Sequence, residues 1–191
     1  MQLETERLIL RDFVSEDWAA VNAYQQDERY WRFYDRQEDG AADRREIVQR
    51  FVADQQRQPR RSYQLAITLK DGGRLIGNVG VRLRRLVDYG VPEVSYEADI
   101  GYELDPKHWG RGYATEAAAA MVAFAFEELK VHRIWAYCLA ENEASWRLLE
   151  RVSFKREGDL RENEWMRGRY WDTYLYGLLA EEWAAGQIGG R

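Results

Sequence analysis

One short stretch, residues 109–116, constrains the fold more than any other part of the chain. Its sequence is Trp-Gly-Arg-Gly-Tyr-Ala-Thr-Glu, and it lies between an alternating apolar run that ends at Leu104 and an alanine-rich helical run over Ala117–Phe126. A strand, a glycine turn and a helix in this order place several backbone N–H groups at a helix N-terminus, where an anion is favoured. Gly110 and Gly112 let the main chain approach that anion closely. The stretch therefore predicts a binding site for a phosphate-bearing ligand.

Two common phosphate-binding motifs do not fit this stretch. A dinucleotide-binding Rossmann turn needs a third glycine, but Gly112 is followed by Tyr113, Ala114 and Thr115. The stretch also lacks the Gly-Lys-Ser/Thr ending of a nucleotide P-loop. Gly112-x-Ala114 instead resembles the acyl-CoA loop of the GNAT superfamily of N-acetyltransferases. In that family the amides of the loop hold the pyrophosphate of coenzyme A.

A second motif makes the resemblance more specific. Residues 142–154 begin with Asn-Glu-Ala-Ser and end with Ser-Phe, and they are similar to the family's Asn-x-x-Ser…Gly-Phe segment. Asn142 also suits the N-cap of the following helix, so it has a purely structural explanation as well. Two motifs in the right order and spacing are harder to obtain by chance than either alone. Together they predict an acyl-CoA-dependent transferase.

Within the superfamily the pattern resembles one branch, the RimJ/RimL ribosomal-protein N-terminal acetyltransferases and their relatives. The similarity extends over residues 101–117 and over the ending Gly-x-Tyr-x-Asp-x-x-x-Tyr at residues 168–176. Two positions depart from the family pattern. Trp109 stands where Gln or Arg is common, and Ser153 replaces the usual glycine before Phe154. The second departure puts only the local turn geometry in question.

The composition limits what else the chain can be. Its 191 residues contain no linker, repeat or low-complexity tract, so we expect a single domain over residues 1–191. The net charge of −5 argues against a nucleic-acid partner. The arginine cluster over residues 82–85 is expected to be a solvated edge, with contact to an acidic partner or to the ribose phosphate of the cofactor as the alternative. Cys138 is the only cysteine and is expected to be a small core residue, so neither a disulfide nor a metal site is expected. Neither a signal peptide nor a membrane span is recognisable, so we expect a cytoplasmic protein.

The hydrophobic pattern predicts alternating strands and helices. A strand over residues 8–12 precedes a helix capped by Ser15, and a second helix is expected over residues 43–56. Asp71-Gly72-Gly73 marks a hairpin turn between strands 63–69 and 75–83. The other expected elements are strands 96–104, 134–139, 154–160 and 170–177 and helices 117–126, 144–151 and 178–185. This order predicts an α+β, or mixed α/β, three-layer fold, and it matches the GNAT plan along nearly the whole chain.

The resemblance implies acetyl-CoA as the co-substrate and no metal. It assigns cofactor binding to the loop and to the elements beside it: Tyr102, Leu104, Trp109, Gly110, Arg111, Gly112, Tyr113, Ala114, Thr115, Asn142 and Ser145. The strand around Tyr102–Leu104 is the candidate source of a backbone N–H for the oxyanion of the reaction.

Three carboxylates compete for the role of base in amide formation. By resemblance to the RimL type, Ser145 assists the leaving thiolate and Glu164 handles the amine proton; the alternative for Glu164 is a solvated charge on a hairpin. Asp99 and Glu103 are the competing bases, because alternation places both on one side of their strand, opposite the apolar residues. The tyrosine acid of other GNAT branches would fall at Leu149, so that mechanism is not available here.

The acceptor is less constrained than the cofactor. Trp31, Phe33 and Tyr34 are either core or lid residues or, in this fold, one wall of the acceptor groove. A peptide or protein N-terminal α-amine is the first choice, because its pKa of about 8 requires less help from a base than a lysine pKa of about 10.4. The alternatives are a small amine (polyamine, amino acid or aminoglycoside) and a non-catalytic acyl-CoA-binding regulatory module. A monomer and a homodimer are both open.

Overall fold

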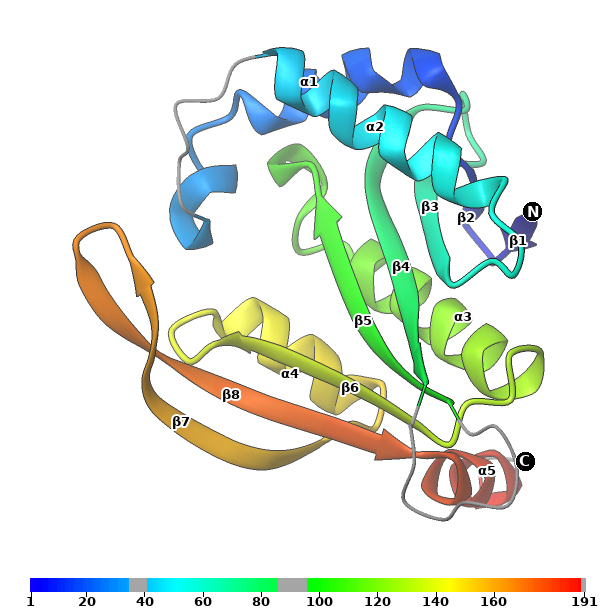
Figure 1. Cartoon of the computed structure of the whole chain (residues 1–191), viewed down its shortest axis with the longest axis vertical. Coiled ribbons are helices and arrows are strands. Elements are labelled where there is room, and N and C mark those ends of the chain that lie inside the picture. Colours follow the sequence, from blue (N-terminus) through cyan, green and yellow to red (C-terminus); the bar gives the residue numbers. More distant parts are fainter. Residues whose placement is uncertain (35–40, 86–95, 190–191) are drawn as a thin grey trace.

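One mixed sheet organises the molecule (Figure 1). The computed structural model describes residues 1–34, 41–85 and 96–189, and within them the sheet has eight strands in the order β1-β2-β3-β4-β5-β6-β8-β7. Neighbouring strands are antiparallel except β5 and β6, which are parallel. The strands are β1 (Gln2–Glu4), β2 (Leu8–Asp12), β3 (Ser62–Leu69), β4 (Leu75–Arg85), β5 (Tyr96–Leu104), β6 (Arg133–Leu139), β7 (Lys155–Met166) and β8 (Arg169–Leu179).

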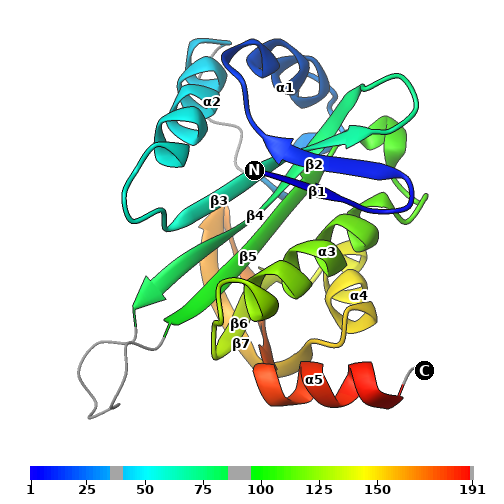
Figure 2. The same ribbon diagram turned by 90° about the vertical axis from the view of Figure 1, so that its right-hand side faces the viewer.

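Helices cover both faces of the sheet, which confirms the three-layer prediction (Figure 2). One face carries α1 (Trp18–Gln25) and α2 (Ala41–Gln55), over a core cluster that includes Phe13 and Val48. The other face carries α3 (Tyr113–Glu127) and α4 (Glu143–Arg151), over the larger core cluster. The remaining helical segments are α5 (Ala180–Gly189) and the short 3₁₀ helices η1 (Ser15–Asp17), η2 (Tyr30–Phe33) and η3 (Pro106–His108).

The alanine-rich sequence of α3 explains how this helix packs on the sheet. Its buried residues recur at helical spacing and form one apolar stripe: Ala117, Ala118, Met121, Val122, Ala125 and Phe126. Because half of these side chains are alanine, α3 lies close to the sheet and contacts both β4 and β5. Neither α3 nor any other helix in the part of the chain that the structure describes is long and apolar enough to cross a membrane.

The two central strands separate after a short paired region. The parallel ladder of β5 and β6 covers only the pairs from Glu97–Arg133 to Asp99–Trp135, and beyond it the strands diverge (Figure 1). The carbonyl of Tyr96 accepts a hydrogen bond from the N–H of His132, just before β6. Since alternate residues of a strand direct their main-chain groups to the same edge, the N–H and C=O of Tyr102 face the opening.

The predicted elements are present in the predicted order, and the differences are local. The short strand β1 was not predicted, because three residues carry too little pattern. Ser15 does not cap a helix: it begins η1, and the N–H of the preceding Val14 is bonded to the Asp17 carboxylate at 2.9 Å. The predicted cap was therefore wrong: Val14 occupies the N-cap position, so Ser15 lies one residue too late to cap, and Asp17 reaches back to the Val14 N–H as the N3 residue of a capping box does. β7 extends to Met166, beyond the predicted end at residue 160. The predicted strand was too short because a bulge after Leu160 interrupts the alternation of its side chains.

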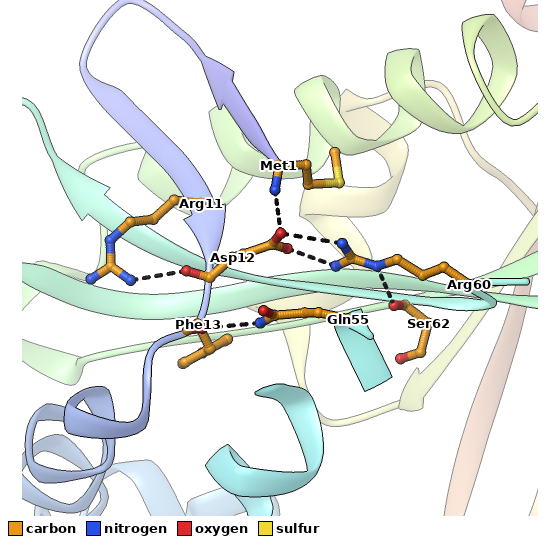
Figure 3. Close-up of polar contacts among 7 residues, drawn as sticks. All are labelled: Met1, Arg11, Asp12, Phe13, Gln55, Arg60 and Ser62. Atoms are coloured by element: carbon orange, nitrogen blue, oxygen red, sulfur yellow. Dashed lines mark hydrogen bonds and ion pairs between the residues drawn. The ribbon is translucent and has the colours of Figure 1, made fainter. Parts of the chain in front are cut away.

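An ion pair ties the end of β2 to the segment that leads into β3 (Figure 3). The Arg60 guanidinium bonds both carboxylate oxygens of Asp12, at 2.7 and 3.2 Å, and its Nε donates to the carbonyl of Ser62 at 3.0 Å. Burial alone would raise the pKa of Asp12, but its bonds with Arg60 help to hold that pKa below its usual value. Gln55, at the end of α2, donates to the carbonyl of Phe13 at 3.1 Å and so fastens α2 to the same corner.

Candidate active site

A cavity of about 1160 Å³ lies where β5 and β6 diverge. Its lining comes from β5 and β6, from α1, η2 and α2, and from the end of β7. The predicted site residues that it brings together are Trp31, Phe33, Tyr34, Tyr102, Glu103, Asn142, Ser145 and Glu164. The other predicted residues, Leu104 and 109–115, are not part of this lining: Leu104 is a core residue, and the loop lies at the start of α3. Within the described residues, no group of His, Cys, Asp and Glu is arranged to hold a metal ion.

The glycine loop presents free backbone donors. Gly110 and Gly112 have φ of +72° and +80°, a left-handed conformation that glycine adopts without the penalty of a Cβ. Gly112 is the N-cap of α3, and its carbonyl accepts the first helical bond, from Glu116 N–H at 3.0 Å. Among the described residues, the N–H groups from Gly110 to Thr115 find no hydrogen-bond partner. Together with the positive end of the helix dipole, they form a site suited to an anion.

Arg7 braces this loop, a role that the sequence did not reveal. Its Nη1 donates to the carbonyl of Arg111 at 2.9 Å, and its guanidinium lies 4.5 Å from the centre of the Tyr113 ring. The Arg7 Nε bonds Glu116 at 2.7 Å, and Thr5 Oγ1 bonds the same carboxylate at 2.6 Å. Burial alone would raise the pKa of Glu116, but these bonds hold it below its usual value. Glu116 is therefore a paired anion and leaves the positive end of α3 available.

Ser145 is held across the opening from β5. The side chain of Asn142 accepts the N–H of Ser145 at 3.3 Å, so the predicted helix cap is confirmed. The Tyr102 hydroxyl lies 3.0 Å from Ser145 Oγ and 3.1 Å from the Ser145 carbonyl oxygen. Burial raises the pKa of Tyr102, so its hydroxyl stays protonated at neutral pH. Leu149, where other branches place a tyrosine acid, is buried in the core.

Cys138 lies on the cavity wall but is poorly suited to be a nucleophile. It is 7% exposed, and burial raises the pKa of its thiol to about 11. Because the thiolate is the reactive form, we expect iodoacetamide at pH 7.5 to alkylate Cys138 roughly 100-fold more slowly in the folded protein than in urea. Mass spectrometry of timed samples measures both rates. Equal rates would contradict this description of the site.

Glu103 is the centre of a hydrogen-bond network that links α1 and η2 to strands β4 and β5. Tyr24 and Gln25 of α1, Tyr30 of η2 and Asn78 of β4 all donate to its carboxylate, with Asn78 at 2.6 Å and Gln25 at 3.2 Å. Burial raises the pKa of Tyr24 and Tyr30, and the negative charge of Glu103 raises it further. Both phenols therefore remain donors. Glu103 faces the cavity, as alternation along β5 predicts, but its oxygens are engaged by the protein.

Asp99 lies on β5, four positions before Glu103, and faces the same cavity. Its Oδ2 accepts Arg82 Nε at 2.6 Å, and Arg84 Nε lies 3.6 Å from its Oδ1. The Arg82 side chain is 56% exposed, as expected for a solvated edge, but it also lines the cavity. Arg84 is exposed, but its guanidinium lies over the ring of Trp135 on β6. The sequence did not reveal that the register of β4 and β5 places Arg82 opposite Asp99.

A bulge in β7 accompanies the placement of Glu164 on the cavity wall. The register with β8 shifts between Leu160 and Glu164, and Glu162 adopts a left-handed conformation with φ of +51°. The N–H of Glu162 bonds Asp172 Oδ1 at 2.8 Å, which holds the bulge to β8. Bulges commonly re-aim a side chain next to an active site. In the described part of the chain, the Glu164 carboxylate makes no hydrogen bond or ion pair.

Comparison with known proteins identifies the family. Residues 7–155 match the family model for an acetyltransferase (GNAT) domain. The uncharacterized N-acetyltransferase YnaD of Bacillus subtilis is 32% identical over 189 residues, which cover 96% of this chain and 99% of the relative. The ribosomal protein uS5-alanine N-acetyltransferase of Escherichia coli is 30% identical over 88 residues, covering 46% of this chain and 45% of that protein.

A solved structure agrees at the level of the fold. RimL, the ribosomal L7/L12 α-N-protein acetyltransferase, in complex with coenzyme A has a TM-score of 0.80 at 19% identity, covering 95% of this chain and 99% of that chain. The chain therefore belongs to the GNAT family of N-acetyltransferases, as the two motifs predicted. It is an acyltransferase that has ribosomal-protein N-acetyltransferases among its relatives.

Proposed function

We propose that this enzyme transfers the acetyl group of acetyl-CoA directly to the N-terminal α-amine of a peptide or protein. The observation that carries the proposal is the row of N–H groups from Gly110 to Thr115, which have no partner in residues 1–34, 41–85 and 96–189 and suit a pyrophosphate. From this loop, the free edge of β5 leads toward the cavity and Ser145. The protein acceptor is supported by the relative that acts on ribosomal protein uS5.

The cavity residues have distinct proposed roles in the reaction. Bound acetyl-CoA supplies a thioester, and the neutral amine of the acceptor is the nucleophile. The main-chain N–H of Tyr102 faces the opening and hydrogen-bonds the carbonyl oxygen as it gains negative charge. Ser145 Oγ donates a hydrogen bond to the sulfur that leaves as a thiolate. The Tyr102 hydroxyl lies 3.0 Å from Ser145 Oγ and holds it in place. Glu164 accepts the proton that the amine loses.

Hydrogen bonding favours Glu164 over Glu103 as this base. Glu103 already accepts hydrogen bonds from four protein donors, three at Oε1 and one at Oε2, so protonation of this carboxylate would disrupt the network. Asp99 is paired with Arg82. Glu164 lines the cavity and has no partner among the described residues, so it is the carboxylate free to accept a proton.

The aromatic residues Trp31, Phe33 and Tyr34 are proposed to form the acceptor wall, since all three line the cavity. A small polyamine is the second candidate acceptor, because the carboxylates of Glu46 and Glu164 line the cavity, although Arg44, Arg50 and Arg82 line it too. We further propose that the enzyme works in the cytoplasm, either as a monomer or as a homodimer.

Released thiol, measured with an alanine-initiated tetrapeptide, tests the acceptor. The peptide carries one internal lysine, and a matched control has its N-terminus formylated. We expect saturable turnover of the free peptide and none of the blocked one, because the α-amine is the group that is easier to deprotonate. Mass spectrometry should place the acetyl group on the α-nitrogen. Acetylation of the lysine in the blocked peptide, or turnover of spermidine alone, would reject an N-terminal acceptor.

A further inference from the structure

The cavity face of β5 has a bare position between two carboxylates. Asp99, Gly101 and Glu103 lie on this face, and Gly101 contributes no side chain. A Cβ built at Gly101 would meet only Arg82 Nη2, at 3.5 Å, which is an ordinary van der Waals contact. The fold therefore accommodates a side chain here.

Two glycines of the neighbouring strand behave differently. On β4, a Cβ at Gly77 would collide with the carbonyl oxygen of Glu103, and a Cβ at Gly80 would collide with the Gln64 side chain. These two glycines are required by close packing within the sheet. Close packing does not require a glycine at position 101, and the lack of a side chain there leaves space open in the cavity.

The carboxylate beside this space has an unsatisfied oxygen. Asp99 is only 5% exposed, and its Oδ1 accepts no hydrogen bond from the described residues. Arg82 and Arg84 of β4 and Trp135 of β6 surround it; Arg82 pairs with Oδ2, and Arg84 Nε lies 3.6 Å from Oδ1. A buried polar atom without a partner is unusual in a folded protein. Oδ1 is covered in the structure, but the neighbouring Arg84 side chain is 62% exposed, so an N–H group of a bound molecule that displaces this side chain would supply the missing donor.

We infer that Gly101 and Asp99 form the subsite for the main chain of the acceptor, next to its reacting amine. This inference rests on the proposed transfer to a peptide N-terminus. The acceptor backbone lies over Gly101, and one of its peptide N–H groups donates to Asp99 Oδ1. Asp99 and Gly101 are two positions apart on one face of β5, which separates them by roughly 7 Å. An extended acceptor spans that distance with roughly two residues, so the peptide N–H that reaches Asp99 lies roughly two residues from the reacting amine. Gly101 is then a residue that determines specificity, because it admits an acceptor with an extended main chain.

Substitution of Gly101 tests the inference with the full-length protein. We expect Gly101→Val to lower kcat/KM at least about 10-fold for the alanine-initiated tetrapeptide, mainly through KM, and Gly101→Ala to lower it less. Alanine amide, which is too short to reach Asp99, should lose less than about 2-fold. The thermal shift produced by coenzyme A should not change. Unfolding in urea should show that both variants fold, whereas the control Gly80→Ala should be destabilised, because its Cβ would collide with the backbone carbonyl of Tyr63 as well as with the Gln64 side chain.

A peptide lacking one donor provides the second measurement. N-methylation of the second or third peptide nitrogen should lower kcat/KM about 5-fold or more with the wild-type enzyme, and one of the two positions should have the larger effect.

The outcomes separate the subsite from the proposed function. If Gly101→Val leaves kcat/KM for the peptide unchanged, the subsite is overturned while acetylation of N-termini stands. If both acceptors lose equally, or if coenzyme A binding is lost, Gly101 acts on the reacting centre or on the cofactor, and the inference is rejected. If the wild-type enzyme turns over only spermidine, the proposed function fails. The peptide subsite is then rejected too, unless the peptide inhibits spermidine turnover competitively and Gly101→Val weakens that inhibition without changing the turnover of spermidine.

Discussion

Glu164→Gln is expected to lower kcat by about 10²- to 10⁴-fold, the usual contribution of a general base. Glutamine keeps the size of the side chain but cannot accept the proton of the amine. The defect should be larger at pH 7 than at pH 9, because an α-amine with a pKa of about 8 is mostly neutral at the higher pH. Released thiol measured across this range, with acetyl-CoA saturating, gives kcat for both enzymes. The coenzyme A thermal shift should be unchanged, since Glu164 lies in the cavity and not at the glycine loop.

Glu162→Gln is the matched control on the same hairpin. Glu162 is exposed, and the structure uses its backbone N–H, which the substitution preserves. We expect kcat within about 2-fold of the wild-type value. If Glu164→Gln behaves in the same way as this control, Glu164 is only a solvated charge, and the base must be sought elsewhere in the cavity.

The parts of the site that could be predicted have conformations determined by residues that are close together in the sequence. The glycine loop depends on the conformational freedom of Gly110 and Gly112 and on the helix that begins directly after them. The cap of α4 joins Asn142 to Ser145, three residues on. Such short-range features appear as motifs in one sequence. The strands and helices were predictable for a similar reason, since burial of one face produces a period of two or of 3.6.

The parts that the sequence did not predict depend on long-range pairing. Arg7 and Glu116 are 109 positions apart, and no local pattern connects them. The contact between Tyr24 and Glu103 spans 79 positions. The competition among Asp99, Glu103 and Glu164 stayed open because alternation shows which face a carboxylate occupies but not which donors approach it. Only the packing of α1 and η2 over β5 shows that Glu103 is already engaged.

Glu103→Ala is expected to lower the free energy of unfolding by about 2–4 kcal/mol. The substitution removes the acceptor of four donors, so the hydrogen bonds that join α1, η2 and β4 to this position of β5 are lost. Each buried donor without a partner destabilises by about 1–3 kcal/mol, but water can enter the cavity and replace part of the loss. Urea unfolding followed by fluorescence measures the change. Glu143→Ala is the control: its carboxylate is 65% exposed and pairs with Arg147 one helical turn away, so we expect a change below about 0.5 kcal/mol.

A double-mutant cycle with Tyr30→Phe shows whether the loss comes from this network. Tyr30→Phe alone removes one donor and should destabilise the wild-type protein, because the Glu103 oxygen then loses a bond. In the Glu103→Ala background the same change should have a smaller effect, since the hydroxyl no longer has its acceptor. Additive effects would contradict the network. If Glu103→Ala abolishes turnover with no loss of stability, Glu103 is the base and the role assigned to Glu164 is wrong, because an anchor and a base are distinguished by which quantity the substitution changes.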